Sequence, residues 1–213
     1  MGLVAKESGG GDGTFTPVPP GMYLARCYRI VDLGTQKSEY QGQVKNLKKF
    51  MLQFEVHGDD DEGRPLVTAK GEPMSISKNF TLSLAEKATL RKDLETWRGR
   101  PFTENERAGF QLENLLGVWA MISVIKALGK DGKDYTNIAN INSVPKAMKA
   151  NLPEGYNKCA EFYIDKPDME LFETFSNNLQ AKIAKSPEWQ TRGKPTEHSK
   201  GSGFDDMVDD MPF

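Results

Sequence analysis

Alternating apolar and polar residues predict five β-strands in the first two-thirds of the chain. The strands are expected at residues 21–33, 47–57, 74–82, 117–128 and 135–144. The second shows the pattern most clearly, since the apolar residues of one face are Phe50, Leu52, Phe54 and Val56. In the first strand, the apolar row that ends at Cys27 resumes at Ile30 on the opposite parity. This change of parity predicts a β-bulge near Tyr28 and Arg29.

A helix is predicted between the third and fourth strands, and a polar loop is expected at residues 35–46. Residues 83–86 have the form of a capping box, and the apolar positions that follow at helical spacing are Leu90, Leu94 and Trp97. Gly99 and Pro101 are expected to end the helix. Three strands, a helix and two strands are the order of an OB-fold, a five-stranded Greek-key barrel in which the helix plugs one end. We therefore expect a mainly β protein with helices, built on such a barrel.

A second helix is predicted after the barrel, at residues 168–185. Its apolar residues recur every four positions and are Leu171, Phe175, Leu179 and Ile183. Pro187 is expected to stop it. We expect this helix to dock on the barrel, with a contact between two copies of the chain as the alternative.

Composition divides the chain into three parts. Residues 1–20 are rich in Gly and Pro and are expected to form a flexible N-terminal arm. Residues 21–187 would form the OB-fold domain with its C-terminal helical extension. From residue 188 onward, Gly, Ser, Lys and Pro predict a flexible linker that leads to an acidic tail at the end of 188–213.

Charge and cysteine content narrow the class of protein. The net charge is −2, but removing the four aspartates of the last ten residues leaves the body at +2. A weakly positive body with an acidic arm is compatible with a basic groove. Cys27 and Cys159 stand in no metal-ligand spacing, so we expect neither a metal nor another cofactor. With no membrane span or signal peptide expected, the predicted location is the cytoplasm.

The sequence offers little support for an enzyme. No serine stands in a nucleophile elbow, no His-Glu-x-x-His occurs, and residues 132–134 lack the other residues of a P-loop. His57 lies at a strand end and His198 in the linker, where each is more easily explained as a solvated or capping residue. The sequence therefore favours binding without catalysis.

A binding groove for unpaired nucleic acid has better support. Such a groove needs cations along the phosphates and flat side chains under the bases. The candidates lie on or beside strands that an OB barrel turns toward its ligand. They are Arg26, Tyr28, Arg29, Lys37, Tyr40, Lys45, Lys49, Gln53, Lys78, Phe80, Trp119, Lys126, Lys130, Lys133 and Tyr135.

Several of these candidates also have a purely structural interpretation. Phe80, like Tyr23, fits a core position better than a base platform, and Trp97 is expected in the core. Trp119 would either stack on a ligand or lie under the C-terminal helix. The lysines taken one by one look like solvated surface residues, and only their coincidence with tyrosines favours binding.

The last ten residues, FDDMVDDMPF, match neither an amphipathic helix nor an alternating strand. Closely spaced like charges keep such a segment extended. The final aromatic ring beside a carboxylate suits a pocket with apolar walls and a cationic rim. The residues expected to bind a partner are Asp205, Asp206, Asp209, Asp210, Met211, Pro212 and Phe213. A solubilising acidic tail is the simpler alternative.

This ending resembles the C-terminal tip of bacterial and phage single-stranded DNA-binding proteins. The body, including residues 77–84, looks like the phage type of that family. The resemblance implies a protein that coats and protects single-stranded DNA without sequence preference during replication, recombination and repair. It also implies that the tip recruits partner proteins and competes with DNA for the groove, in the host cytoplasm if the protein is phage-encoded. The alternatives are an OB-fold adaptor that binds proteins and an RNA-binding regulator.

Overall fold

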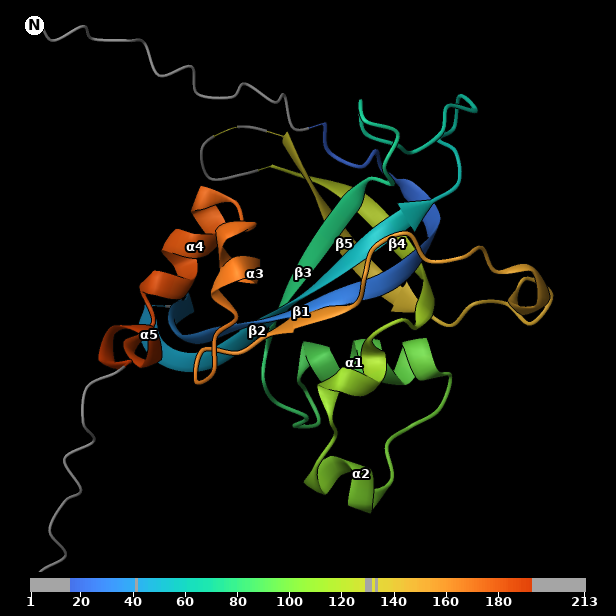
Figure 1. Cartoon of the computed structure of the whole chain (residues 1–213). Coiled ribbons are helices and arrows are strands. Elements are labelled where there is room, and N and C mark those ends of the chain that lie inside the picture. The colour runs from blue at the N-terminus through green and yellow to red at the C-terminus, as the bar shows by residue number, and fades with distance from the viewer. Residues whose placement is uncertain (1–15, 41, 129–131, 133, 193–213) are drawn as a thin grey trace, which may run out of the picture.

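The computed structural model describes residues 16–40, 42–128, 132 and 134–192 (Figure 1). Its centre is a six-stranded, mainly antiparallel sheet in the order β3-β2-β1-β4-β5, with β6 added in parallel to β1. The strands are β1 (Gly21–Tyr40), β2 (Gln43–His57), β3 (Ser75–Thr81), β4 (Trp119–Leu128), β5 (Asp134–Asn142) and β6 (Ala160–Phe162). The sheet curls until its two end strands meet, where Lys78 Nζ on β3 donates to Ala139 O on β5 at 3.0 Å.

Short helices surround this sheet. The α-helices are α1 (Thr89–Arg98), α2 (Glu104–Ala108), α3 (Met169–Glu173), α4 (Asn177–Ala184) and α5 (Pro187–Thr191), and the 3₁₀ turns are η1 (Leu112–Leu115) and η2 (Lys149–Asn151). The expected order of three strands, a helix and two strands is confirmed, with α1 lying below the sheet in Figure 1. In the described residues no helix has the length and apolar character needed to cross a membrane.

The polar stretch at 35–46 is not the predicted loop. It extends β1 and begins β2, so that the two strands form a long hairpin in which Tyr40 pairs with Gln43. Gly42, at φ 75°, supplies the left-handed residue of the turn. The sequence pattern does not reveal this hairpin, because neither of its faces carries a row of apolar residues and no alternation is present to detect.

The first hydrophobic core fills the inside of the curled sheet. Its fully buried residues include Ile30, Leu52, Phe54, Leu94, Ile122 and Ile141. Trp97 of α1 lies in this core as predicted, with its ring 5.6 Å from that of Phe54 and its Nε1 donating to Trp119 O at 2.9 Å. Leu82 and Val118, at the ends of the third and fourth predicted strands, are apolar but exposed.

The predicted bulge is present and lets β1 bury both of its faces. Cys27 pairs with Phe54 and Arg29 with Gln53, so Tyr28 is the extra residue. After the bulge, Ile30 packs into the first core, while Val31 and Leu33 pack into a second core on the opposite face of the strand. The second core consists of Val31, Leu33, Met51, Phe162, Ile164, Phe175 and Ile183.

Helices α3, α4 and α5 cover this second core, which corrects the prediction of one helix over 168–185. The helix is interrupted after α3, and α4 begins anew at Asn177. Ser176 caps α4, since its side chain accepts a hydrogen bond from Leu179 N at 3.4 Å. The predicted apolar stripe nevertheless packs inward. Pro187, expected to stop the helix, is the first residue of α5, since proline fits the first helical turn.

The start of α1 also differs from the prediction. Ser83 Oγ accepts from Ala85 N at 3.2 Å in a turn, and the helix begins only at Thr89. The capping box that does form is Thr103 with Glu106, at the start of α2. The end of α1 at Gly99 is as predicted, with that residue left-handed at φ 71°.

Replacing Trp97 with alanine should lower the free energy of unfolding by roughly 3–5 kcal/mol, because the change removes a large core ring and orphans a carbonyl acceptor. Urea denaturation followed by circular dichroism measures the loss. Tyr156→Ala is the matched control, since Tyr156 is exposed. Equal stabilities of the two variants would contradict the position of Trp97 in the core.

Candidate nucleic-acid interface

A groove of about 690 Å³ is lined by residues of β2 and β3, of α4 and of the turn between α3 and α4. Its floor comes from the strands and one of its walls from the helices. The floor and end residues are Pro17, Val18, Arg29, Met51, Gln53, Ser75, Ile76, Ser77, Asn79 and Asp134 to Asn137. The wall residues are Thr174, Phe175, Ser176, Asn178, Leu179 and Lys182.

Strand register explains the polar character of the floor. Gln53 pairs with Ser77, and Met51 pairs with Asn79, so these side chains lie side by side on the outward face. Ser75 lies one step further along the same row of β3. Hydroxyl and amide groups of this kind both donate and accept hydrogen bonds, so the floor suits polar ligands of varied structure.

Arg29 brings a positive charge to the groove, and the bulge is the reason it faces outward. Its guanidinium carbon lies 5.3 Å from the centre of the Tyr28 ring and 5.5 Å from that of Phe175. Its Nη1 is 3.5 Å from Gln53 Oε1, while its Nε is buried without a hydrogen-bond partner in the described residues. No described carboxylate pairs with Arg29, so its charge remains available to an anion.

Lys182 of α4 is the second cation of the groove lining. Sequence analysis missed it, because it stands on a helix that was interpreted only through its apolar stripe. Ser75, Ser77 and Asn79 were also missed. The signal for them was available, since they occupy the polar parity of the third predicted strand.

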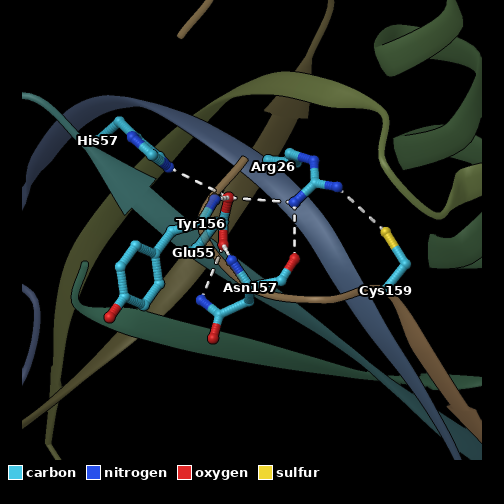
Figure 2. Close-up of polar contacts among 6 residues, drawn as sticks. All are labelled: Arg26, Glu55, His57, Tyr156, Asn157 and Cys159. Atoms are coloured by element: carbon cyan, nitrogen blue, oxygen red, sulfur yellow. Dashed lines mark hydrogen bonds and ion pairs between the residues drawn. The ribbon is translucent and has the colours of Figure 1, made fainter. Parts of the chain in front are cut away.

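A separate polar cluster surrounds Glu55, on the outward face of β2 (Figure 2). The carboxylate is fully buried. It accepts hydrogen bonds from Asn157 N at 2.6 Å, Asn157 Nδ2 at 2.7 Å and Tyr156 N at 2.9 Å. His57 Nε2 lies 3.2 Å and Arg26 Nη1 3.3 Å from its oxygen. These contacts fasten the segment before β6 to β1 and β2.

Hydrogen bonding decides the protonation state of Glu55. Burial alone would raise the pKa of this carboxyl group, but the hydrogen bonds from Asn157, His57 and Tyr156 outweigh burial and lower the pKa below its ordinary value. Glu55 therefore stays ionised. Its contribution to stability is complete above the pKa of the unfolded chain and is lost as pH falls through the lower, folded pKa.

The structure brings only part of the predicted binding set to the groove. Arg29, Gln53 and Tyr135 line it, whereas Lys49 is half-buried on β2 and is not among the lining residues. Arg26 is instead held in the Glu55 cluster, where its guanidinium also donates to Asn157 O at 3.0 Å and Cys159 Sγ at 3.2 Å.

Other predicted binding residues have structural roles. Tyr28 is buried, and Phe80, with Tyr23, lies in the first core, which agrees with the core interpretation of both. Lys78 forms an ion pair with Asp93 of α1 at 2.7 Å. Trp119 is half-buried, with its ring edge-on to that of His57 at 4.9 Å.

The remaining candidates lie outside the groove lining or outside the described residues. Lys37 and Lys45 are exposed on the β1–β2 hairpin, and Lys126 is exposed on β4. Tyr40 is placed by its backbone only, as the last residue of β1. Lys130, Lys133 and the acidic tip at 205–213 fall outside the described part of the chain.

The described residues contain no group of three or more His, Cys, Asp or Glu side chains that could hold a metal ion. No protein-family model matches the chain, and no curated protein matches its sequence. The function proposed below therefore depends on the geometry of the groove and on its charges.

Replacing Glu55 with glutamine should lower the free energy of unfolding at pH 7 by roughly 3 kcal/mol, because the amide removes a buried charge that Arg26 and several N–H donors require. The wild type should lose stability as pH falls below about 4.5, while the variant should lose less over the same interval. Urea denaturation at a series of pH values measures both effects. The control is Glu154→Gln, on an exposed side chain of the same segment.

Proposed function

We propose that the protein binds single-stranded DNA, without sequence preference, in the groove between β2–β3 and the helices α3 and α4. The observation that carries the proposal is that two cations, Arg29 and Lys182, line a groove whose floor carries hydroxyl and amide groups. Phosphates require such cations, and a polar floor accepts the edges of different bases.

The strand arrangement supports an OB-fold barrel as the body. The path β3-β2-β1-β4-β5, the contact between β5 and β3, and the position of α1 between β3 and β4 agree with that fold. In OB-folds the face of strands two and three binds oligonucleotides and oligosaccharides. If the body is an OB-fold, the groove lies on the corresponding face.

An aromatic ring at the end of the groove adds a stacking surface. Tyr135 on β5 is exposed and belongs to the groove lining. Stacking a base on such a ring contributes about 1–3 kcal/mol and tolerates any base. Bases paired inside a duplex are not available for this contact, so the proposed site selects unpaired strands.

We further propose that the acidic tip recruits partner proteins and shields the groove when DNA is absent. Support for this role comes from the sequence: four aspartates and a final Met-Pro-Phe resemble the tips of single-stranded DNA-binding proteins. A tethered acidic segment would compete with phosphates for Arg29 and Lys182.

The groove is tested with a fluorescently labelled oligo-dT, a duplex of equal length and oligo-U, each titrated with the full chain in an anisotropy assay. Oligo-dT should bind most tightly. The slope of the logarithm of its affinity against the logarithm of salt concentration should be about −0.7 per phosphate contact. Tighter binding of oligo-U would favour the RNA-binding alternative. No binding to any of the three would favour the adaptor.

Arg29→Met should weaken oligo-dT binding about tenfold, because a hydrogen bond to a charged group contributes about 1.5 kcal/mol. Methionine keeps the apolar stem that packs on Tyr28 and Phe175. The matched control is Lys92→Met, which removes the same charge from the exposed side of α1. If both variants bind oligo-dT equally, Arg29 does not contact the strand and the groove is not the site.

Deleting residues 204–213 should raise the affinity for oligo-dT, most clearly at low salt, since the intramolecular competitor is then unscreened. Phe213→Ala keeps every aspartate and should leave that affinity unchanged, while capture of replication proteins on an immobilised sample should be lost. An unchanged affinity after truncation, together with full capture by Phe213→Ala, would leave the tip as a solubilising tail.

A further inference from the structure

The segment that joins β5 to β6, residues 145–159, returns across the outward face of β2, and we call it the strap. It loops out beside the sheet before it reaches β6 (Figure 1). Glu55 holds its returning part, since Tyr156 N and Asn157 N donate to that carboxylate at 2.9 and 2.6 Å. The guanidinium of Arg26 adds a hydrogen bond to Asn157 O at 3.0 Å. The backbone at Tyr156 therefore has a defined position on the sheet.

Close packing at Gly155 fixes the strap further. A side chain at this position would overlap the guanidinium of Arg26, which is itself held by Glu55 and Cys159. The backbone can come this close to the sheet because residue 155 is glycine. The ring of the next residue, Tyr156, lies on the opposite side of Glu55 from Cys159 (Figure 2).

Tyr156 presents its ring to solvent. The residue is 59% exposed, more than Tyr135 of the groove lining at 46%. Among the described residues, none forms a hydrogen bond or a ring contact with the Tyr156 side chain. Because the backbone beneath it is already fixed, only side-chain torsions become ordered when a flat group stacks on this ring, which keeps the entropic cost of binding low.

The strap lies beside the floor of the groove. Glu55, which holds the strap, pairs across β2 and β3 with Ser75, and Ser75 lines the groove. Gln53 is the preceding residue on the same face of β2, and its Nε2 lies 3.4 Å from Ser75 Oγ. Neighbouring residues on one face of a strand are about 7 Å apart. A chain that leaves the groove at this end therefore comes within reach of the strap.

The charges of the strap favour a polyanion. Its cations are Lys146, Lys149 and Lys158, and its one carboxylate is that of Glu154. All four side chains are exposed, and none of the three lysines forms an ion pair among the described residues. The carboxylate of Glu55 beneath the strap is fully buried among hydrogen-bond donors, so it does not face a ligand in solvent.

We propose that Tyr156 stacks on an unpaired base of a strand that leaves the groove, while the strap lysines neutralise phosphates beside it. This proposal deepens the proposed function and rests on it for the ligand, a single strand. Stacking on a tyrosine ring tolerates any base, as binding without sequence preference requires. A strand must extend beyond the groove before it reaches Tyr156, so the contribution of this residue depends on the length of the strand.

The test titrates labelled oligo-dT of increasing length with the full-length wild type and three variants in an anisotropy assay. Tyr156→Ala should weaken the binding of long strands at least about fivefold, because it removes one stacked base, and should leave the shortest bound strand unaffected. Tyr156→Phe keeps the ring and should bind like the wild type. The matched control is Met148→Ala, which removes an exposed apolar side chain of the strap but no ring, and it should also bind like the wild type.

The outcomes separate failure of the stacking position from failure of the proposed function. If the wild type binds oligo-dT and Tyr156→Ala binds every length equally well, the groove remains and the stacking position is wrong. If Tyr156→Phe loses as much affinity as Tyr156→Ala, the contact is made by the hydroxyl group and the stacking position is again wrong. If the wild type binds oligo-dT of no length, the proposed function fails and the stacking position fails with it.

A direct readout comes from photochemical cross-linking. A long oligo-dT that carries iododeoxyuridine should, on irradiation, become attached to the wild type at Tyr156, which mass spectrometry of the digested complex identifies. Attachment at groove residues without attachment at Tyr156 would overturn the proposal.

Discussion

The architecture depends on β1 and β2 burying both faces along their central length. On one side they enclose the first core, and on the other Val31, Leu33 and Met51 require a cover of their own. The bulge at Tyr28 makes this possible, since it shifts the parity of β1 and turns Arg29 outward beside Gln53. The need to cover the outward face brings α3 to α5 to the sheet, and the groove lies where that cover ends.

Four cations on or beside the sheet fall into two groups with different roles. Arg26 and Lys78 are paired with Glu55 and Asp93, and these pairs join segments that are far apart in the sequence. Arg29 and Lys182 have no such partner among the described residues and face the groove. Neutralised charges contribute to holding the fold, whereas unpaired charges in a concave surface create a positive potential that attracts anions.

The strands were predictable because a sheet with one buried face imposes a period of two on the sequence. The hairpin at 35–46 was not, since no face of it is apolar. The break between α3 and α4 was invisible as well, because the four-residue spacing of Leu171, Phe175, Leu179 and Ile183 continues across it. At the site, the sequence identified Arg29, Gln53 and Tyr135 as binding candidates. It could not show which of Arg26 and Arg29 is paired with a carboxylate. Only the fold shows that Glu55 lies next to the first and not the second.

The helical cover of the second core also sets an order of events during synthesis. A ribosome delivers β1, β2 and β3, with the groove floor, well before α3, α4 and α5. Until those helices emerge, the outward face of β1 and β2 is an uncovered apolar surface, and the groove has no wall and no Lys182. A nascent chain with its first core complete would thus lack the helical wall of the groove. If the groove is the binding site proposed above, a chain becomes able to bind only after α3, α4 and α5 have been translated, and unfinished chains do not occupy the ligand.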